Sequence, residues 1–267
     1  PYLFLKLFWG FPRNILKHYA CKIKPKSPFR RKFRDGRPVK GALTFTGLSG
    51  IIPYKDVLGC GIMRFIGSKA HLLEKIDQVI LEHATGRETI FCDIFSGTGV
   101  VARYFKPRYE IHSNDILYFS YVIQKATVEN NKKPVFLKLR DGGISDPFRF
   151  LEEAEIPPMD KGHLFITEHY SPHEHCKRMY LSHKNALRAD FIRNTLDAWK
   201  KQCLVTELEY YYLLAGLIEA IPSVSNITGT YGAYLKHWDK RALKDLEMVR
   251  LDVVDNKRKN RCYQQDA

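Results

Sequence analysis

The chain has few of the features that mark secreted, metal-stabilised or membrane-inserted proteins. Its six cysteines, at positions 21, 60, 92, 176, 203 and 262, form no Cys-x-x-Cys pair, so neither a disulfide framework nor a zinc ribbon is indicated. No apolar run reaches the roughly 18–20 residues that a membrane-spanning helix needs. Pro172 interrupts the one histidine pair with helical spacing, His169 and His173, which argues against a metal-binding helix. We therefore expect a folded protein of a reducing, cytoplasmic setting, with no metal and no membrane contact.

Acidic residues are scarce at one end of the chain only. The formal net charge is +14, but residues 1–62 hold 13 Lys/Arg and 2 Asp/Glu, which leaves a net of only +3 for the other 205 residues. Such a basic leader is typical of a solvated tail or of an arm that contacts nucleic acid. Because the first methionine is Met63, a third interpretation is that residues 1–62 are translated from upstream of the natural start. The sequence leaves these alternatives open.

From Met63 onward the apolar pattern alternates between strands and helices. Helical spacing after Ser68, which can cap the first turn, predicts a helix that runs to about Ala84. Strands are expected over residues 89–94 and 109–113, each followed by a helix, over 100–105 and 119–129. This βαβα order is typical of a doubly wound α/β sheet.

The pattern changes at residues 135–182, where Gly and Pro predict loops and short strands. Helices are expected over 185–201 and 207–221, and a further strand over 247–254. We therefore expect a basic leader over 1–62, an α/β half over 63–134, a partly helical insertion over 135–246, and a return to the sheet over 247–267.

The sharpest local signal is the segment Phe91-Cys-Asp-Ile-Phe-Ser-Gly-Thr-Gly-Val-Val-Ala102. Glycines at positions 97 and 99, between a strand and a helix, permit a tight turn and let a ligand approach the backbone. Asp115 follows at the end of the next strand, where it can accept hydrogen bonds from a ribose. The spacing also satisfies the Gly-x-Gly-x-x-Ala form of the dinucleotide fingerprint. From the turn alone, NAD, another nucleotide and no ligand all stay open.

Two further motifs separate these alternatives. Asp93 and Phe95 stand in Asp-x-Phe-x-Gly-x-Gly, and Met63-Arg-Phe-Ile-Gly-Ser-Lys69 precedes the strand by about twenty residues. With Asn114-Asp115, they resemble the adenine-specific DNA methyltransferases, which bind S-adenosylmethionine (SAM) on a Rossmann-like sheet. The ending Cys262-Tyr-Gln-Gln-Asp-Ala267 resembles a strand end in that family. The resemblance implies a SAM site made of Phe65, Gly67, Lys69, Asp93, Phe95, Gly97, Gly99, Asp115 and Asp266.

Within that set the resemblance also implies roles. Lys69 and the backbone near Gly67 would meet the methionine end of SAM, Asp93 its amino group, Asp115 its ribose and Asp266 its adenine. A lysine in the first turn of a helix opposes the helix dipole, so a partner anion would help to explain Lys69. The alternative is a solvated surface lysine.

A second resemblance lies in Ser225-Asn-Ile-Thr-Gly-Thr-Tyr-Gly-Ala-Tyr-Leu-Lys-His-Trp-Asp-Lys-Arg241. It is similar to an Asn-x-x-Gly-x-Tyr-Gly segment that follows the target-recognition region in one branch of the family. Interleaved amides, cations and aromatic rings suit DNA, because they can reach base edges, phosphates and base faces. An ordinary polar loop around a buried Trp238 and Tyr231 is the alternative. We expect contacts with double-stranded DNA from Tyr170, Arg178, Asn226, Thr228, Tyr231, Lys236, Lys240 and Arg241.

No catalytic residue is assigned. In the family an Asp-Pro-Pro-Tyr motif holds the adenine amine and stacks on the flipped base. The nearest strings here, Asp146-Pro-Phe148 and Ile156-Pro-Pro-Met-Asp160, do not fit that motif. By the family's order of motifs the catalytic strand would follow Ala267, so the expectation is a truncated product that is inactive alone.

The sequence thus predicts a site-specific adenine DNA methyltransferase of a restriction–modification system, with a cognate endonuclease encoded nearby as a partner. A DNA-binding remnant without catalysis is the alternative. An NAD-dependent oxidoreductase is less favoured, because the Asp93 and Asn226 motifs would then be coincidences.

Overall fold

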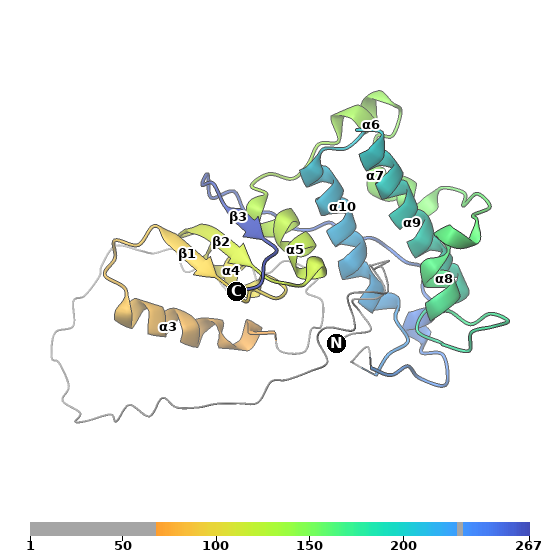
Figure 1. The fold of residues 1–267 in the computed structure, drawn as a ribbon, viewed down its shortest axis with the longest axis horizontal. Coiled ribbons are helices and arrows are strands. Elements are labelled where there is room, and N and C mark those ends of the chain that lie inside the picture. Colours follow the sequence, from red (N-terminus) through yellow and green to blue (C-terminus); the bar gives the residue numbers. More distant parts are fainter. Residues whose placement is uncertain (1–67, 229–231) are drawn as a thin grey trace.

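The computed structural model describes residues 68–228 and 232–267, which form a small parallel sheet with helices and a larger group of helices beside it (Figure 1). The strands β1 (Ile90–Asp93), β2 (Glu110–Asn114) and β3 (Arg261–Tyr263) are parallel and lie in the order β1-β2-β3. The expected strands over 89–94 and 109–113 are confirmed, and so is the mixed α/β architecture. The expectations for residues 1–62, Phe65, Gly67 and Tyr231 lie outside the described residues.

The helices next to the sheet occupy the segments that the apolar spacing predicts. They are α3 (Leu73–His83), α4 (Val100–Phe105) and α5 (Tyr118–Gln124), and α5 continues as one π-helical turn, η2 (Lys125–Glu129). The expectation that Ser68 caps the long helix is wrong. Its hydroxyl lies 3.4 Å from the N–H of Ala70, in the short 3-10 helix η1 (Ala70–Leu72), and α3 has no side-chain cap.

After η2 the chain leaves the sheet and returns to it at β3. In between lie α6 (Leu137–Asp141), α7 (Pro147–Glu153), η3 (Lys161–His163), α8 (Phe165–Tyr170), α9 (His183–Lys201), α10 (Glu207–Ala220), η4 (Ile221–Val224) and η5 (Lys240–Leu243). The helices expected over 185–201 and 207–221 are confirmed. The short strands expected within 135–182 are wrong, because short helices take their place and bury Leu139, Leu151 and Ile166 in one core with α9 and α10. Tertiary packing here overrides the local proline and glycine signals.

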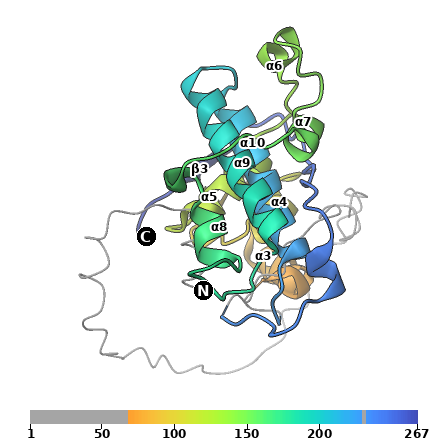
Figure 2. The same ribbon diagram turned by 90° about the vertical axis from the view of Figure 1, so that its right-hand side faces the viewer.

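The helix α10 is the centre of this core. Every residue from Tyr210 to Ala220 is buried, and a capping box between Thr206 and Glu209 closes its first turn. A helix that is apolar on all sides is expected to be buried on all sides. In Figures 1 and 2 it lies beside α9, and its end leads through η4 into the segment that carries the second sequence motif.

The strand expected over residues 247–254 is wrong. This segment has no regular secondary structure and pairs with no strand among the described residues. Instead it crosses α10, where Val249 N–H donates to the carbonyl of Gly216 (3.2 Å) and the Tyr212 hydroxyl donates to the carbonyl of Leu251 (2.7 Å). A Cβ at Gly216 would lie 2.6 Å from the carbonyl oxygen of Val249, so only glycine allows this crossing. The apolar pattern of the segment reflects packing on a helix.

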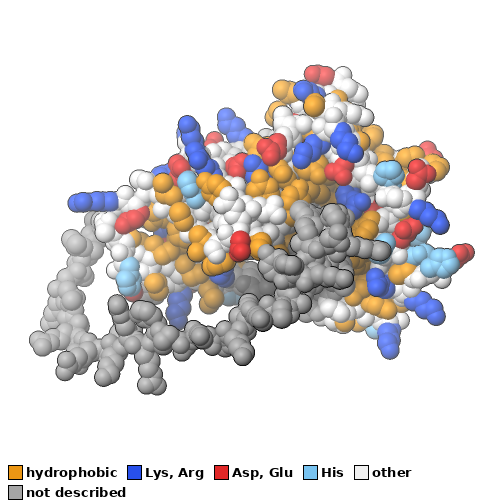
Figure 3. Space-filling view, in the orientation of Figure 1, with side chains coloured by type: hydrophobic (Ala, Val, Ile, Leu, Met, Phe, Trp, Pro, Cys, Tyr) orange, Lys and Arg blue, Asp and Glu red, His pale blue; other side chains and the backbone are white. Residues whose placement is uncertain are grey.

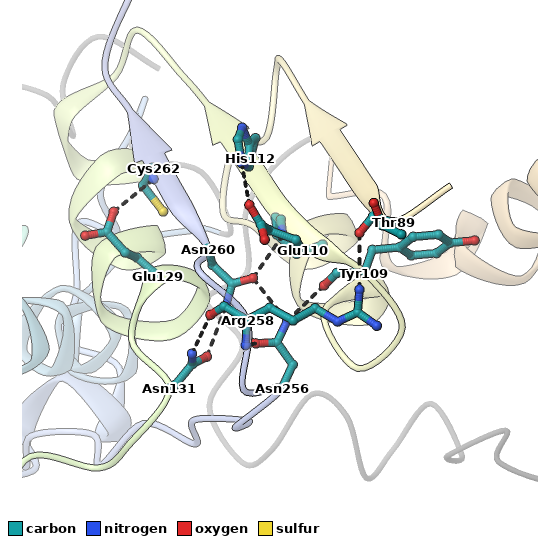
Figure 4. A network of polar contacts seen from close by, with 11 residues as sticks. Thr89, Tyr109, Glu110, His112, Glu129, Asn131, Asn256, Arg258, Asn260 and Cys262 are labelled. Carbon is teal, nitrogen blue, oxygen red and sulfur yellow. Dashed lines mark hydrogen bonds and ion pairs between the residues drawn. The ribbon is translucent and has the colours of Figure 1, made fainter. Parts of the chain in front are cut away.

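A set of asparagines fixes β3 to the rest of the sheet (Figure 4). The Asn256 amide donates to the carbonyls of Lys106 and Tyr109 (both 2.9 Å), and Asn260 Oδ1 accepts from the N–H of Ile111 (2.9 Å). On the other side, Cys262 N–H donates to Glu129 Oε2 (2.9 Å). These bonds replace part of the ladder that so short a strand lacks. They hold the end of the chain beside the carboxyl end of β2.

Candidate functional site

The glycine turn joins the carboxyl end of β1 to α4, as the strand–turn–helix pattern predicts. Gly97 and Gly99 both have positive φ angles, +53° and +72°, a conformation that non-glycine residues seldom adopt. Ser96 fastens the turn to the neighbouring strand, because its N–H and its hydroxyl lie 3.1 Å and 2.7 Å from the carbonyl oxygen of Asn114. The turn is therefore held in one conformation by β2.

Asp115 lies where β2 ends and serves the turn directly. Its Oδ2 accepts from the N–H of Gly97 (2.7 Å), and its Oδ1 accepts from the N–H of Leu117 (2.9 Å). Each carboxylate oxygen has a second lone pair, so both can still accept a hydrogen bond from a ligand hydroxyl. The side chain thus combines an observed structural role with the geometry that the expected ribose contact requires.

At the same edge, Asp93, the last residue of β1, has a buried carboxylate oxygen, Oδ2, that has no hydrogen-bond partner among the described residues. Burial raises the pKa of this carboxyl group, while the charge of Lys69 and the backbone N–H of Phe95 act to lower it. A buried carboxylate oxygen without a partner is unfavourable. An ammonium group of a ligand would satisfy it, so the site fits the cationic amino group expected there.

The remaining candidates gather around these two carboxylates. Lys69 is exposed, and its Nζ donates to the carbonyl of Phe95 (3.2 Å). Phe95 itself is 66% exposed and Ile116 is 59% exposed, which leaves an apolar surface at the carboxyl edge of the sheet. Asn114 and Gln265 exchange two 3.0 Å hydrogen bonds, so the exposed Asp266 lies at this edge as well.

Asn226 lies in the interior and closes the segment that follows η4. Its side-chain amide donates to the carbonyls of Leu235 and His237 (both 3.1 Å), and its Oδ1 accepts from the N–H of Asp239 (3.0 Å). The residue is 0% exposed. Both amide hydrogens and one lone pair of Oδ1 are therefore used inside the loop, and the expected contact of Asn226 with DNA stays a prediction.

The other residues expected to contact DNA divide into buried and exposed groups. Tyr170 is buried against the ring of Tyr180 at 5.9 Å, and burial raises its pKa to about 12. Arg241 is half-buried and donates to the carbonyl of Ser225 (3.3 Å). The exposed members are Arg178, Thr228, Lys236 and Lys240.

Three of the exposed members, Thr228, Lys236 and Lys240, belong to the segment after η4, and Arg178 donates to the carbonyl of His169 in α8. Figure 3 shows Lys and Arg side chains along the lower right of the molecule, where Figure 1 places α8 and the segment after η4. Trp238 is half-buried in that segment. Among the described residues, the cofactor candidates therefore lie together at the sheet edge and the DNA candidates lie on the helical group.

Asp146 and Asp160, which lie in the strings nearest to the Asp-Pro-Pro-Tyr motif, are not placed near the candidate cofactor site. Asp146 caps α7 by accepting from the N–H of Phe148 (3.0 Å) and pairs with Arg250 (2.6 Å). It borders a shallow cavity of about 340 Å³ that includes none of the predicted site residues. Asp160 is exposed. Within the described ranges, no group of three His, Cys, Asp or Glu residues could hold a metal ion, and no helix is long and apolar enough to cross a membrane.

Gln124 also contacts the glycine turn, although it is not among the site residues that the sequence predicts. Its side chain contacts the glycine turn from α5 and is 0% exposed. The signal was present, because a glutamine stands among Val122, Ile123 and Ala126 where helical spacing predicts burial.

The comparisons with known proteins cover most of the chain. The family model of the D12 class N6 adenine-specific DNA methyltransferases matches residues 65–267. The chain is 51% identical over 205 residues to Type II methyltransferase M.FokI of Planomicrobium okeanokoites and 50% identical over 205 residues to Modification methylase StsI of Streptococcus sanguinis. Each match covers 77% of this chain and 31% of the relative. Type II methyltransferase M.NlaIII of Neisseria lactamica is 32% identical over 208 residues, which are 77% of this chain and 59% of that protein.

The chain therefore spans about a third of the length of the first two relatives. No solved structure matches it significantly. The family model nevertheless extends over far more than half of the 267 residues, across the glycine turn, both carboxylates and the segment closed by Asn226. The chain belongs to the family of D12 class N6 adenine-specific DNA methyltransferases.

Proposed function

We propose that this chain carries the cofactor-binding and DNA-recognition parts of an enzyme that methylates the exocyclic amine of adenine in DNA. The single observation that carries the cofactor assignment is the unpartnered, buried Oδ2 of Asp93 beside the glycine turn. SAM, when bound, supplies a methyl group on a sulfonium, which a nitrogen nucleophile can accept. The residues of this chain would bind and orient it.

The proposed SAM site uses different side chains for different parts of the ligand. Asp93 would accept from the ammonium group, and Lys69, whose exposed amine donates to the carbonyl of Phe95, would meet the carboxylate. Asp115 would accept from the ribose hydroxyls with the lone pairs that Gly97 and Leu117 leave unused. Phe95 supplies exposed apolar surface, and Asp266 would lie toward the adenine. Phe65 and Gly67 belong to the proposal through the family resemblance.

The charge of Asp93 also argues against NAD. A dinucleotide places its pyrophosphate at the glycine turn, where a carboxylate at the end of β1 would repel it. SAM brings an ammonium group to the same position, and Asp93 would attract it. We therefore prefer SAM to NAD at this site, although the glycine spacing alone suits both.

We propose that exposed lysine and arginine side chains bind the DNA phosphates and that buried polar groups hold the loop that carries some of them. Arg178, Lys236 and Lys240 would contact phosphates, and Thr228 and Tyr231 would contribute from the loop itself. Asn226, Tyr170 and Arg241 would hold that loop in shape through the contacts described above.

At the level of architecture, we propose that the three parallel strands are half of a Rossmann-like, doubly wound sheet. Residues 63–134 and 255–267 would build that half, and residues 135–254, the last eight of which pack on α10, would form a target-recognition insertion. Because relatives are named modification methylases, we propose a role in restriction–modification, with a cognate endonuclease as partner.

Calorimetric titration of the 267-residue chain with SAM and, separately, with NAD tests the cofactor assignment. We expect SAM to bind and NAD not to bind. Binding of NAD without binding of SAM would contradict the proposal. Fluorescence anisotropy with a labelled DNA duplex tests the second part, where we expect salt-sensitive association.

A further inference from the structure

Gln124, the last residue of α5, has a buried polar side chain and is not among the residues of the proposed SAM site. It is 0% exposed, and its amide group faces the glycine turn. Oε1 lies 3.0 Å from the hydroxyl of Ser96, and Nε2 donates to the carbonyl of Gly97 (3.0 Å). Both ends of the amide are therefore bonded to the same short turn, one to the Ser96 side chain and the other to the Gly97 backbone.

The peptide groups of Gly97 are held from two sides. Its N–H donates to Asp115 Oδ2 (2.7 Å), and its carbonyl accepts from Gln124 Nε2 (3.0 Å). The hydroxyl proton of Ser96 is shared, because both the Asn114 carbonyl (2.7 Å) and Gln124 Oε1 (3.0 Å) are in reach. The turn is thus clamped between the end of β2 and the end of α5.

Gln124 also packs directly against the second glycine. A Cβ at Gly99 would lie 3.1 Å from Gln124 Cγ and 3.6 Å from Val128 Cγ2. The helix changes from α to π geometry right after Gln124, and such single π turns are frequent at functional sites. The side chain therefore restricts the position of the Gly99 backbone as well as the orientation of the Gly97 carbonyl.

We propose that Gln124 is a positioning residue of the cofactor site, which holds residues 96–99 in the conformation that binds SAM without touching SAM itself. This inference rests on the proposed function. A turn with two glycines at positive φ has many alternative conformations. Without the clamp, ordering the turn would oppose ligand binding. Affinity should then fall although no contact with the ligand is removed.

The test compares Gln124→Met, Gln124→Glu and a matched control in the 267-residue chain. Methionine keeps the size and removes both hydrogen bonds, whereas glutamate keeps an acceptor for Ser96 but turns a carboxylate toward the Gly97 carbonyl. The control is Thr127→Val, a buried residue in η2 whose hydroxyl donates only to the Ile123 carbonyl (2.7 Å) and does not contact the turn. Each variant is measured for thermal stability and, by calorimetry, for SAM affinity.

We expect both Gln124 variants to weaken SAM binding by roughly tenfold or more, as the loss of about one net hydrogen bond implies. Thr127→Val should lower stability with less than a twofold change in affinity. In a Ser96→Ala background Gln124→Met should lose less affinity than in the unmodified chain, because the bond between the two side chains is already absent and only the bond to the Gly97 carbonyl remains to be lost.

The outcomes distinguish failure of the proposed SAM site from failure of the proposed role of Gln124. If the unmodified chain does not bind SAM, the proposed function fails, and this inference with it. If the unmodified chain binds SAM and the Gln124 variants bind within twofold of Thr127→Val, only the role of Gln124 is refuted. If Gln124→Met does not fold, Gln124→Glu decides, because it removes the donor to the Gly97 carbonyl and keeps an acceptor for Ser96. SAM affinity equal to that of the unmodified chain would overturn the inference.

Discussion

Replacing Asp93 with asparagine should separate folding stability from cofactor affinity. Burial raises the pKa of Asp93 above its ordinary value of 3.8, so the folded state keeps the proton to a higher pH than the unfolded chain does. The free energy of unfolding therefore falls as the pH rises from 3.8 through the folded-state pKa, and it stays lower at neutral pH. Asparagine has the same shape and no charge. We expect the ligand-free variant to be at least as stable as the wild type at pH 7, with the difference vanishing in acid.

The same change should weaken SAM binding. A hydrogen bond to a charged group contributes about 1.5–3 kcal/mol, which corresponds to a loss of roughly 10- to 150-fold in affinity. Urea denaturation between pH 4 and pH 8 and calorimetry with SAM would measure the two effects. Glu110→Gln, at the opposite end of the sheet, serves as the control and should leave SAM affinity unchanged. A less stable Asp93→Asn variant with unchanged SAM affinity would refute the reasoning.

Other changes probe the turn, the loop and the basic surface. Gly97→Ala should lower the free energy of unfolding, measured by urea denaturation, by about 1–2 kcal/mol because of the positive φ at this position. Gly99→Ala should lower it more, because the added Cβ would also lie 3.1 Å from a side chain. Equal losses for the two variants would contradict this packing. Asn226→Ala leaves two carbonyls and one N–H unpaired, so it should cost about 2 kcal/mol or more and lower DNA affinity without altering SAM affinity. A loss of SAM affinity instead would argue against separate sites. Lys236→Ala and Lys240→Ala should each reduce the slope of log affinity against log salt by about 1, and an unchanged slope would exclude phosphate contacts.

The sequence predicts best what depends on neighbouring residues. The turn at Gly97 and Gly99 and the helix after it were predictable, because a strand, two glycines and a helical pattern follow one another directly. The family was recognisable for the same reason, because Asp93 and Asp115 stand at fixed sequence separations from that turn. The mixed α/β class followed from the order of these elements.

What the sequence could not predict depends on contacts between distant segments. Residues 247–254 alternate like a strand, but they pack on α10 because Gly216 lets the backbone approach. Lys106 has the appearance of a surface cation, yet it is 0% exposed, donates to the carbonyls of Thr127 and Asn130, and has its pKa lowered by burial to about 8. The polar pattern around Asn226 predicted a DNA contact and gave no indication that its side chain bonds to the backbone of residues 235–239. Such roles emerge only from tertiary structure.

A crystal structure of the chain with SAM would show whether the cofactor binds at the glycine turn. We expect the amino group of SAM within hydrogen-bond distance of Asp93 Oδ2, with the ribose hydroxyls at Asp115 and the turn over residues 96–99 unchanged. SAM bound elsewhere, or no SAM at a saturating concentration, would contradict this expectation.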